Sequence, residues 1–134
     1  MSYYFATRTS LGFDEALTAA REALKAEGFG IISEIDIKST LKQKIGVDFR
    51  PYVILGACNP ALAHEALQIE DKVGTMLPCN VVIQDLGGEV EIAAINPVAS
   101  MQAIDNDRLK KKARLVADKL DRVIAALERA PAQA

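Results

Sequence analysis

The dipeptide Asn-Pro occurs twice in this chain, each time directly after a short apolar run. Asn59-Pro60 follows residues 52–58, and Asn96-Pro97 follows residues 89–95. Asn is a strong helix N-cap, and Pro suits the first helical position because its missing N–H has no helical partner to lose there. Each dipeptide therefore predicts a strand that ends where a helix begins, which favours a fold that mixes both kinds of element.

The remaining elements follow from hydrophobic periodicity, since apolar residues either alternate or recur every three to four positions. This periodicity predicts strands over about 3–8, 30–37, 52–58, 79–85 and 89–95, and helices over about 13–27, 37–45, 60–69, 97–104 and 107–129. Residues 70–75 are expected to form a loop, and Gly87-Gly88 indicates a hairpin turn between the last two strands.

The order of these elements resembles the split βαβ arrangement of ferredoxin-like folds, with an extra hairpin strand and a C-terminal amphipathic helix added. We therefore expect an α+β fold. Its sheet should be a single layer of about five mainly antiparallel strands, with helices packed on one face.

Length and composition set further expectations. The chain has 134 residues, of which half are hydrophobic and a quarter are charged, which predicts a single domain over 1–134. No apolar run is long enough to cross a membrane and no secretion signal is evident, so we expect no membrane association. A cytoplasmic location, where two cysteines stay reduced, is the corresponding expectation. The net charge of -2 argues against a general binder of nucleic acids.

Cys58 is the most distinctive candidate for chemistry, because it lies between a buried strand and a helix start. The helix N-terminus favours anions, so it could hold a thiolate of Cys58 or a carboxylate or phosphate of a ligand. The competing and favoured interpretation is a small apolar side chain packed where strand meets helix. Cys79 follows Pro78 on the same strand face as Val81 and Ile83, which argues for a core position. A redox pair needs Cα atoms within about 7 Å, which the sequence does not determine.

His64 is the only histidine, and helical spacing places it on the polar side of its helix. With Cys58 and Cys79 it would give three ligands, one short of a closed tetrahedral zinc site. A solvated side chain is the favoured interpretation, and no feature supports a role as an axial haem ligand. The acidic residues form no metal-binding series, so we expect no metal site and name no catalytic residue.

The segment Arg108–Arg114 is the one basic cluster, at the start of the long C-terminal helix. It could contact nucleic acid or an acidic partner, but no aromatic residues accompany it, and a solvated helical face is favoured. The same helix carries a near-heptad apolar stripe, and a small domain with an exposed sheet edge invites pairing. We therefore expect a homodimer and no nucleic-acid binding.

Several of these segments recur together in a known family. They are residues 34–38, 41–46, 52–56, 57–60, 77–79 and 96–97, with Gly-x-Cys-Asn-Pro and Leu-Pro-Cys as the specific pieces. In this order they resemble the bacterial and archaeal family called domain of unknown function 302, over about residues 31–97. The resemblance implies a compact α+β domain that forms dimers. It also implies that the motif residues Cys58, Asn59, Pro60, Pro78 and Cys79 recur, that His64 does not, and it brings no settled activity.

Three hypotheses for function follow, while enzymatic activity and cofactor stay unknown. The first is a homodimeric domain that binds a small molecule or cofactor near Cys58–Pro60, with Pro78 and Cys79 as further candidate ligand-binding residues. The second is a thiol-dependent redox enzyme or sensor that uses Cys58, with Cys79 as the resolving thiol. The third is an adaptor that binds an acidic partner or nucleic acid through Arg108–Arg114.

Overall fold

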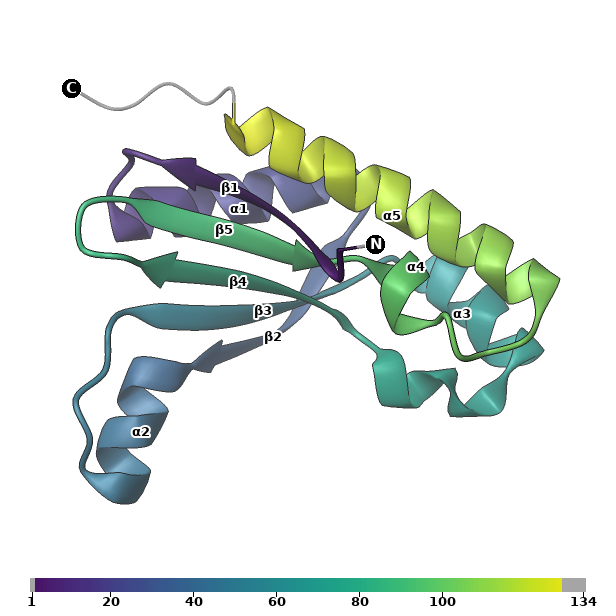
Figure 1. Cartoon of the computed structure of the whole chain (residues 1–134), viewed down its shortest axis with the longest axis horizontal. Coiled ribbons are helices and arrows are strands. Elements are labelled where there is room, and N and C mark those ends of the chain that lie inside the picture. Colours follow the sequence, from purple (N-terminus) through teal and green to yellow (C-terminus); the bar gives the residue numbers. More distant parts are fainter. Residues whose placement is uncertain (1, 129–134) are drawn as a thin grey trace.

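A computed structural model describes residues 2–128 of the chain. Its strands are β1 (Tyr4–Thr9), β2 (Gly30–Asp36), β3 (Tyr52–Cys58), β4 (Cys79–Asp85) and β5 (Val90–Ile95). Its helices are α1 (Phe13–Ala26), α2 (Ile37–Ile45), α3 (Pro60–Ile69), the 3-10 helix η1 (Asp71–Met76), α4 (Pro97–Ser100) and α5 (Asp107–Glu128). The strands form one open sheet in the order β1-β5-β4-β3-β2, and every neighbouring pair is antiparallel (Figure 1). The α+β fold and its five-stranded antiparallel sheet are confirmed.

β1 and β2 lie at opposite edges of the sheet. Four antiparallel pairings separate them, so they run parallel to each other, and α1 connects them. This is a split βαβ unit, in which three strands, β5, β4 and β3, lie between the two parallel strands. The ferredoxin-like resemblance is therefore limited to the β1-α1-β2 unit, because β1 pairs with β5 and not with β3.

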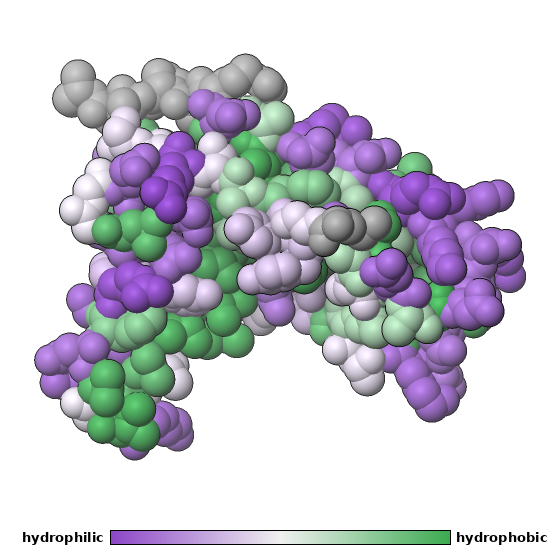
Figure 2. Space-filling view, in the orientation of Figure 1, coloured by the Kyte–Doolittle hydropathy of each residue, from purple (hydrophilic) through white to green (hydrophobic). Residues whose placement is uncertain are grey.

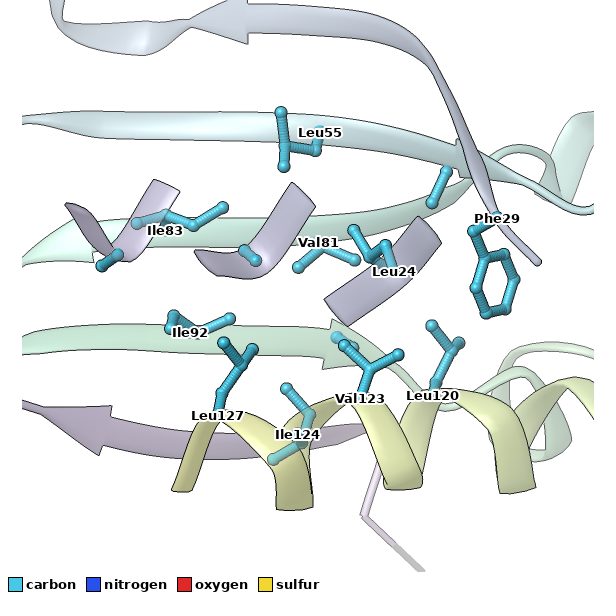
Figure 3. Packing of buried hydrophobic residues seen from close by; sticks show 14 of the residues in the cluster. Leu24, Phe29, Leu55, Val81, Ile83, Ile92, Leu120, Val123, Ile124 and Leu127 are labelled. Atoms are coloured by element: carbon cyan, nitrogen blue, oxygen red, sulfur yellow. The ribbon is translucent and has the colours of Figure 1, made fainter. Parts of the chain in front are cut away.

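The core lies on the face of the sheet against which α1 and α5 pack. Strand alternation places Val81, Ile83 and Ile92 on this face, and all three are fully buried. Figure 3 shows these side chains together with Leu24 of α1 and Leu120 of α5, which belong to the same buried cluster. Burying one such side chain stabilises the fold by roughly 1.5–3 kcal/mol. Because this chain has few aromatic residues, its core obtains most of this stabilisation from aliphatic side chains.

α1 and α5 owe their positions to apolar stripes and suitable ends. Asp14 and Glu15 occupy the first turn of α1, where carboxylates meet the positive helix end, and Gly28 after the helix adopts φ +87°. α5 is 22 residues long and packs on α1, β1 and β5. Despite this length, neither α5 nor any other helix within residues 2–128 is long and apolar enough to cross a membrane.

Two segments differ from the sequence prediction. Residues 70–75 were expected to form a loop, but Asp71–Met76 form η1, because the Glu70 carboxylate accepts the N–H of Lys72 at 3.0 Å and satisfies the helix start. Val73 is fully buried there, in a second, smaller apolar cluster. α4 ends at Ser100 and not near residue 104, because Met101 leaves the helical conformation at φ -100° and ψ 10°.

α2 extends away from the rest of the molecule, at the lower left of Figure 1. Its start is capped by Asp36, which accepts the N–H of Ser39 at 2.9 Å, and Gly46 ends it at φ 68°. None of its residues is buried. Ile45 and the following Val47 are exposed, and Figure 2 shows apolar surface over this part of the molecule.

Candidate functional site

Both Asn-Pro junctions are helix N-caps, as the sequence predicts. At the start of α3 the side-chain oxygen of Asn59 accepts the N–H of Leu62 at 3.2 Å, and Asn96 caps α4 in the same way. Asn59 also lies against the turn after α1, since a Cβ added at Gly28 would come within 3.3 Å of its side-chain nitrogen. The strand-to-helix turn after Cys58 is therefore held both by its own cap and by a neighbouring turn.

Cys58 ends β3 and Cys79 begins β4, which are neighbouring strands. Cys79 pairs directly with Ala57, so Cys58 lies one residue beyond the paired position. Paired residues in an antiparallel ladder lie about 5 Å apart and successive residues about 3.4 Å along the strand, so the two cysteine Cα atoms lie about 6 Å apart. This Cα separation is within the range that a disulfide spans, but Cys58 follows the residue paired with Cys79, so the register directs the two side chains to opposite faces of the sheet. Both thiols are free.

The two thiols lie in different environments. Cys79 is 7% exposed, and burial raises its pKa from 9.0 to about 11, with a further contribution from the charge of Cys58. Cys58 is half-buried beside the start of α3. Cys79 is thus a protonated core thiol at neutral pH, in the core position that its alternation with Val81 and Ile83 predicts.

A small pocket lies between the β3-α3 turn, the start of β4 and α5. Four of the candidate residues line it: Cys58, Asn59, Pro78 and Cys79. Leucines and alanines make up much of the remaining wall, and the volume of the pocket is about 40 Å³. This exceeds the roughly 10–15 Å³ that one buried water needs, so the pocket accepts a small group.

Lys112 supplies the charge in the pocket wall. Its Nζ lies 2.5 Å from Oε2 of Glu65, so the ion pair joins α5 to α3. The hydrogen bond and the charge of Lys112 lower the pKa of Glu65. Both side chains are partly exposed, and such pairs contribute little to stability. The main consequence of this pair is to hold the Lys112 ammonium, balanced by the Glu65 carboxylate, at the edge of the pocket.

Gly56 allows two neighbouring segments to approach β3 closely beside the pocket. A Cβ at this position would overlap the hydroxyl of Ser33 on β2 and would lie 2.8 Å from Cγ of Pro78. The peptide bond that precedes Pro78 is cis. The glycine of the Gly-x-Cys-Asn-Pro segment therefore has a packing role, because it leaves the space that Pro78 occupies next to Cys79.

Two of the residues singled out from the sequence lie outside this pocket. Pro60 occupies the first turn of α3 and is exposed, and His64 is also exposed, as its helical spacing predicts. No cluster of three or more His, Cys, Asp or Glu side chains that could hold a metal ion occurs in residues 2–128.

The basic segment Arg108–Arg114 is divided by the geometry of α5. Leu109 and Ala113 face the core, and Lys112 faces the pocket, while Arg108, Lys111 and Arg114 are exposed. This division supports its interpretation as a largely solvated helical face.

Sequence reasoning did not single out Phe29 or Met101 of the pocket wall, and it named Lys112 only as part of the basic segment Arg108–Arg114. They come from the α1-β2 turn, the segment after α4, and α5, which are far apart in the chain. Lys112 belongs to the basic cluster, but nothing local indicates its pairing with Glu65. Met101 carried no signal at all, because only the fold brings it to the cysteines.

The fold and this site together define a class of small α+β domain with one open antiparallel sheet and a pocket where β3 meets α3. The chain belongs to the family described as "Domain of unknown function DUF302", whose model matches residues 5–127. It is similar to an uncharacterized conserved DUF302 protein from Bacillus stearothermophilus, known from a crystal structure, with 29% sequence identity and a TM-score of 0.88. That similarity covers 95% of this chain and 99% of the other. A search of curated proteins gave no match.

Proposed function

We propose that this domain binds a small ligand in the pocket beside Cys58. The observation that carries the proposal is that Cys58, Asn59, Pro78 and Cys79, which stand out in the sequence, line one cavity at a strand-to-helix turn. Ligand sites are typically concave and mostly apolar, with a few polar groups that orient the ligand. Here Asn59 and Lys112 are the polar groups, and apolar side chains make up most of the wall.

The chemistry of the pocket favours a particular kind of ligand. The pocket is small, about 40 Å³, and mostly apolar, so it favours a small apolar group. The positive end of α3 favours negative charge at the edge of the pocket, where the Lys112 ammonium is already balanced by Glu65. The ligand is therefore either very small or the narrow end of a larger molecule.

Amide NMR spectra recorded with a library of small compounds test this proposal. Binding should shift the amides of Cys58, Leu77 and Ala113, which line the pocket. Ala63 lines the pocket and is half-buried, so Ala63→Phe should weaken binding more than about tenfold, or about 1.4 kcal/mol. Ala61→Phe is the matched control, because Ala61 is exposed on the same helix and outside the wall. Equal binding by both variants would rule this pocket out.

Thiol chemistry at Cys58 is a second candidate function, supported by its position next to Cys79 on the neighbouring strand. In a sensor of this kind a peroxide would oxidise the Cys58 thiolate to a sulfenic acid, and the resolving thiol Cys79 would then displace water from it to form the disulfide. The raised pKa of Cys79 opposes this, because a protonated thiol is a poor attacking group at neutral pH. We therefore place it second, and we assign either function to the cytoplasm because both thiols are free.

Mass spectrometry after treatment with glutathione disulfide separates the two outcomes. An intramolecular Cys58–Cys79 disulfide supports the redox function. A lasting glutathione adduct on Cys58, with Cys79 unmodified, contradicts it.

We also propose that the domain forms a homodimer through the sheet face opposite α1 and α5. Tyr4 is exposed there, and Tyr52 and Val82 line a hollow of about 320 Å³. Strands about 4.8 Å apart and residues about 3.4 Å apart give the face an area of roughly 500 Å². α2, with its exposed Ile45, adds to this area, and the sum approaches the roughly 800 Å² per partner of a standard interface.

A further inference from the structure

Helix α2 projects from the domain and leaves an apolar stripe open to solvent (Figure 1). Ile37, Leu41 and Ile45 recur every four residues, so they share one side of the helix. None of the nine residues of α2 is buried, and Ile45 is 66% exposed. Helices shorter than about 12–15 residues are marginal in water by themselves and take most of their stability from packing. Within residues 2–128, the stripe of α2 therefore lacks the contact that a helix of this length needs.

The open face of the sheet, opposite α1 and α5, carries a hollow of about 320 Å³. Val82 and Ala93 pair across β4 and β5 and form its apolar floor, because they alternate with the core residues of their strands. Tyr4 and Tyr52 line it from β1 and β3. The small floor between these larger side chains leaves room for several aliphatic side chains.

The register of the sheet allows two copies to fill each other's hollow. Asp36, where β2 ends, pairs with Val53, and this row ends at Ile92 on β5. α2 therefore starts at the same end of the sheet as the β4-β5 hairpin, but at the opposite edge from β1. A two-fold axis parallel to the strands, between two facing sheets, keeps this end in place and exchanges the edges. It carries α2 of each copy over β5 of the other, and both contacts form at once, as isologous symmetry requires.

The charges around the stripe and around the hollow are opposite in sign. Helical spacing places Lys44 on one side of the stripe and Lys38 on the other, and neither forms an ion pair in the part of the chain that the structure describes. At the hairpin end of the hollow the charged side chains are two arginines and three carboxylates, namely Arg8, Arg50, Asp85, Glu89 and Glu91. Their net charge is -1, which the two lysines complement.

The area of the sheet face also favours a contribution from α2. The face alone offers roughly 500 Å² per copy, whereas a standard interface buries roughly 800 Å² per partner. Docking of α2 covers the stripe of one copy and the hollow of the other, so each of the two contacts adds area on both copies.

We propose that the homodimer is held by reciprocal docking of α2. The stripe formed by Ile37, Leu41 and Ile45 of each copy lies in the hollow over Val82 and Ala93 of the other. This inference rests on the proposed homodimer, because it names the segment that each copy contributes to the interface.

Isotope-filtered NOE spectra of the wild-type protein test the contact directly. In a sample that mixes labelled and unlabelled chains, NOEs between chains should join the methyl groups of Ile45 to those of Val82 or Ala93. NOEs between chains that join Val82 only to its own counterpart would overturn the docking of α2 and leave a dimer of stacked sheets standing.

Two surface variants give a second test, which depends on how chains pair. Ile45→Lys or Val82→Asp alone damages both contacts of a homodimer and should weaken it by about tenfold or more. A heterodimer of the two variants has one unchanged contact and one in which the introduced ammonium meets the introduced carboxylate. Native mass spectrometry of an equimolar mixture should therefore show heterodimers in excess of random pairing.

Leu115→Lys replaces Ile45→Lys in the matched control mixture, because Leu115 is exposed on α5 and away from the hollow. These chains should pair with Val82→Asp at random. Random pairing of Ile45→Lys with Val82→Asp as well would overturn the docking of α2, while the homodimer itself would stand. A wild-type chain that stays monomeric would overturn both.

Discussion

At the scale of single residues, burial and close packing determine what the motif side chains can do. Cys79 belongs to the main apolar cluster with Val81 and Ile83, so its thiol is kept protonated by its surroundings. Gly56 leaves the space that Pro78 fills. The Gly-x-Cys-Asn-Pro and Leu-Pro-Cys segments thus depend on each other through contact across β3 and β4.

Cys79 should make the protein less stable in alkali. Its pKa is raised to about 11 in the folded state, so between about pH 9 and 11 the unfolded chain loses this proton while the folded chain keeps it. The free energy of unfolding should therefore fall across this window, by about 3 kcal/mol from this group alone, and should be unaffected by it below pH 9. Urea unfolding at several pH values measures the fall.

Cys79→Ala should reduce that slope, whereas Cys58→Ala should keep most of it. Tyrosines and lysines titrate in the same range but are common to all three proteins. The same slope in Cys79→Ala and in the wild type would contradict the burial argument.

Gly56→Ala should destabilise the fold by about 1–3 kcal/mol, because the added methyl group would overlap the Ser33 hydroxyl and press on Pro78. Thermal unfolding measures the effect. Gly74→Ala is the matched control, since a Cβ at Gly74 meets nothing within 4 Å. Adding Ser33→Gly to Gly56→Ala should recover part of the loss, and a double variant no more stable than Gly56→Ala would contradict the assigned contact.

At the scale of elements, the sequence predicts what local chemistry encodes and misses what distant segments contribute. The alternation of Val81 and Ile83 and the caps at Asn59 and Asn96 are local, so the strands and helix starts they predict are present. η1 was missed because its stability comes partly from the burial of Val73 against other elements. The order of the strands was not accessible either, since strand pairing depends on partners far along the chain.

The same limit applies to the candidate site. Cys58, Asn59, Pro78 and Cys79 lie in two short motifs, so they could be found by reading along the chain. Lys112 and the other wall residues outside the motifs reach the pocket only after α5 and α4 have packed.

The N-cap at α3 should contribute measurably to stability. Asn59→Ala removes the acceptor for the N–H of Leu62 and should lower the free energy of unfolding by about 1 kcal/mol. Asn80→Ala is the control: Asn80 is exposed, its side chain makes no hydrogen bond within residues 2–128, and its loss should change stability by less than about 0.5 kcal/mol. Chemical denaturation measures the free energy of unfolding of both variants. Equal losses would mean that the cap hydrogen bond does not contribute to stability.

At the scale of the whole molecule, several large apolar side chains are exposed away from α1 and α5, among them Ile35 on β2 and Ile45 on α2. Helices α1 and α5 cover one face of the sheet, while α2 and the strands near it present apolar surface to solvent (Figure 2). Exposed apolar area of this extent is typical of interaction surfaces. The proposed homodimer would cover it.

Light scattering at micromolar concentration should therefore give twice the mass of the chain. Ile45, which is 66% exposed on α2, should lie in the interface, so Ile45→Lys should weaken dimerisation by about 10-fold or more. Leu115→Lys is the matched control, because Leu115 is 49% exposed on α5 and away from this face. A monomeric wild type, or a dimer equally sensitive to both changes, would argue against this interface.

The pairing of β1 with β5 also bears on how the protein is made. Phe5 lies opposite Ala94, so of the five strands of this sheet the one made first pairs only with the one made last. At about 5–20 residues per second, β1 waits roughly 5–20 s for its neighbour. During that time Thr7, Arg8 and Thr9 make half of this six-residue strand polar, which lowers its tendency to associate with other nascent chains.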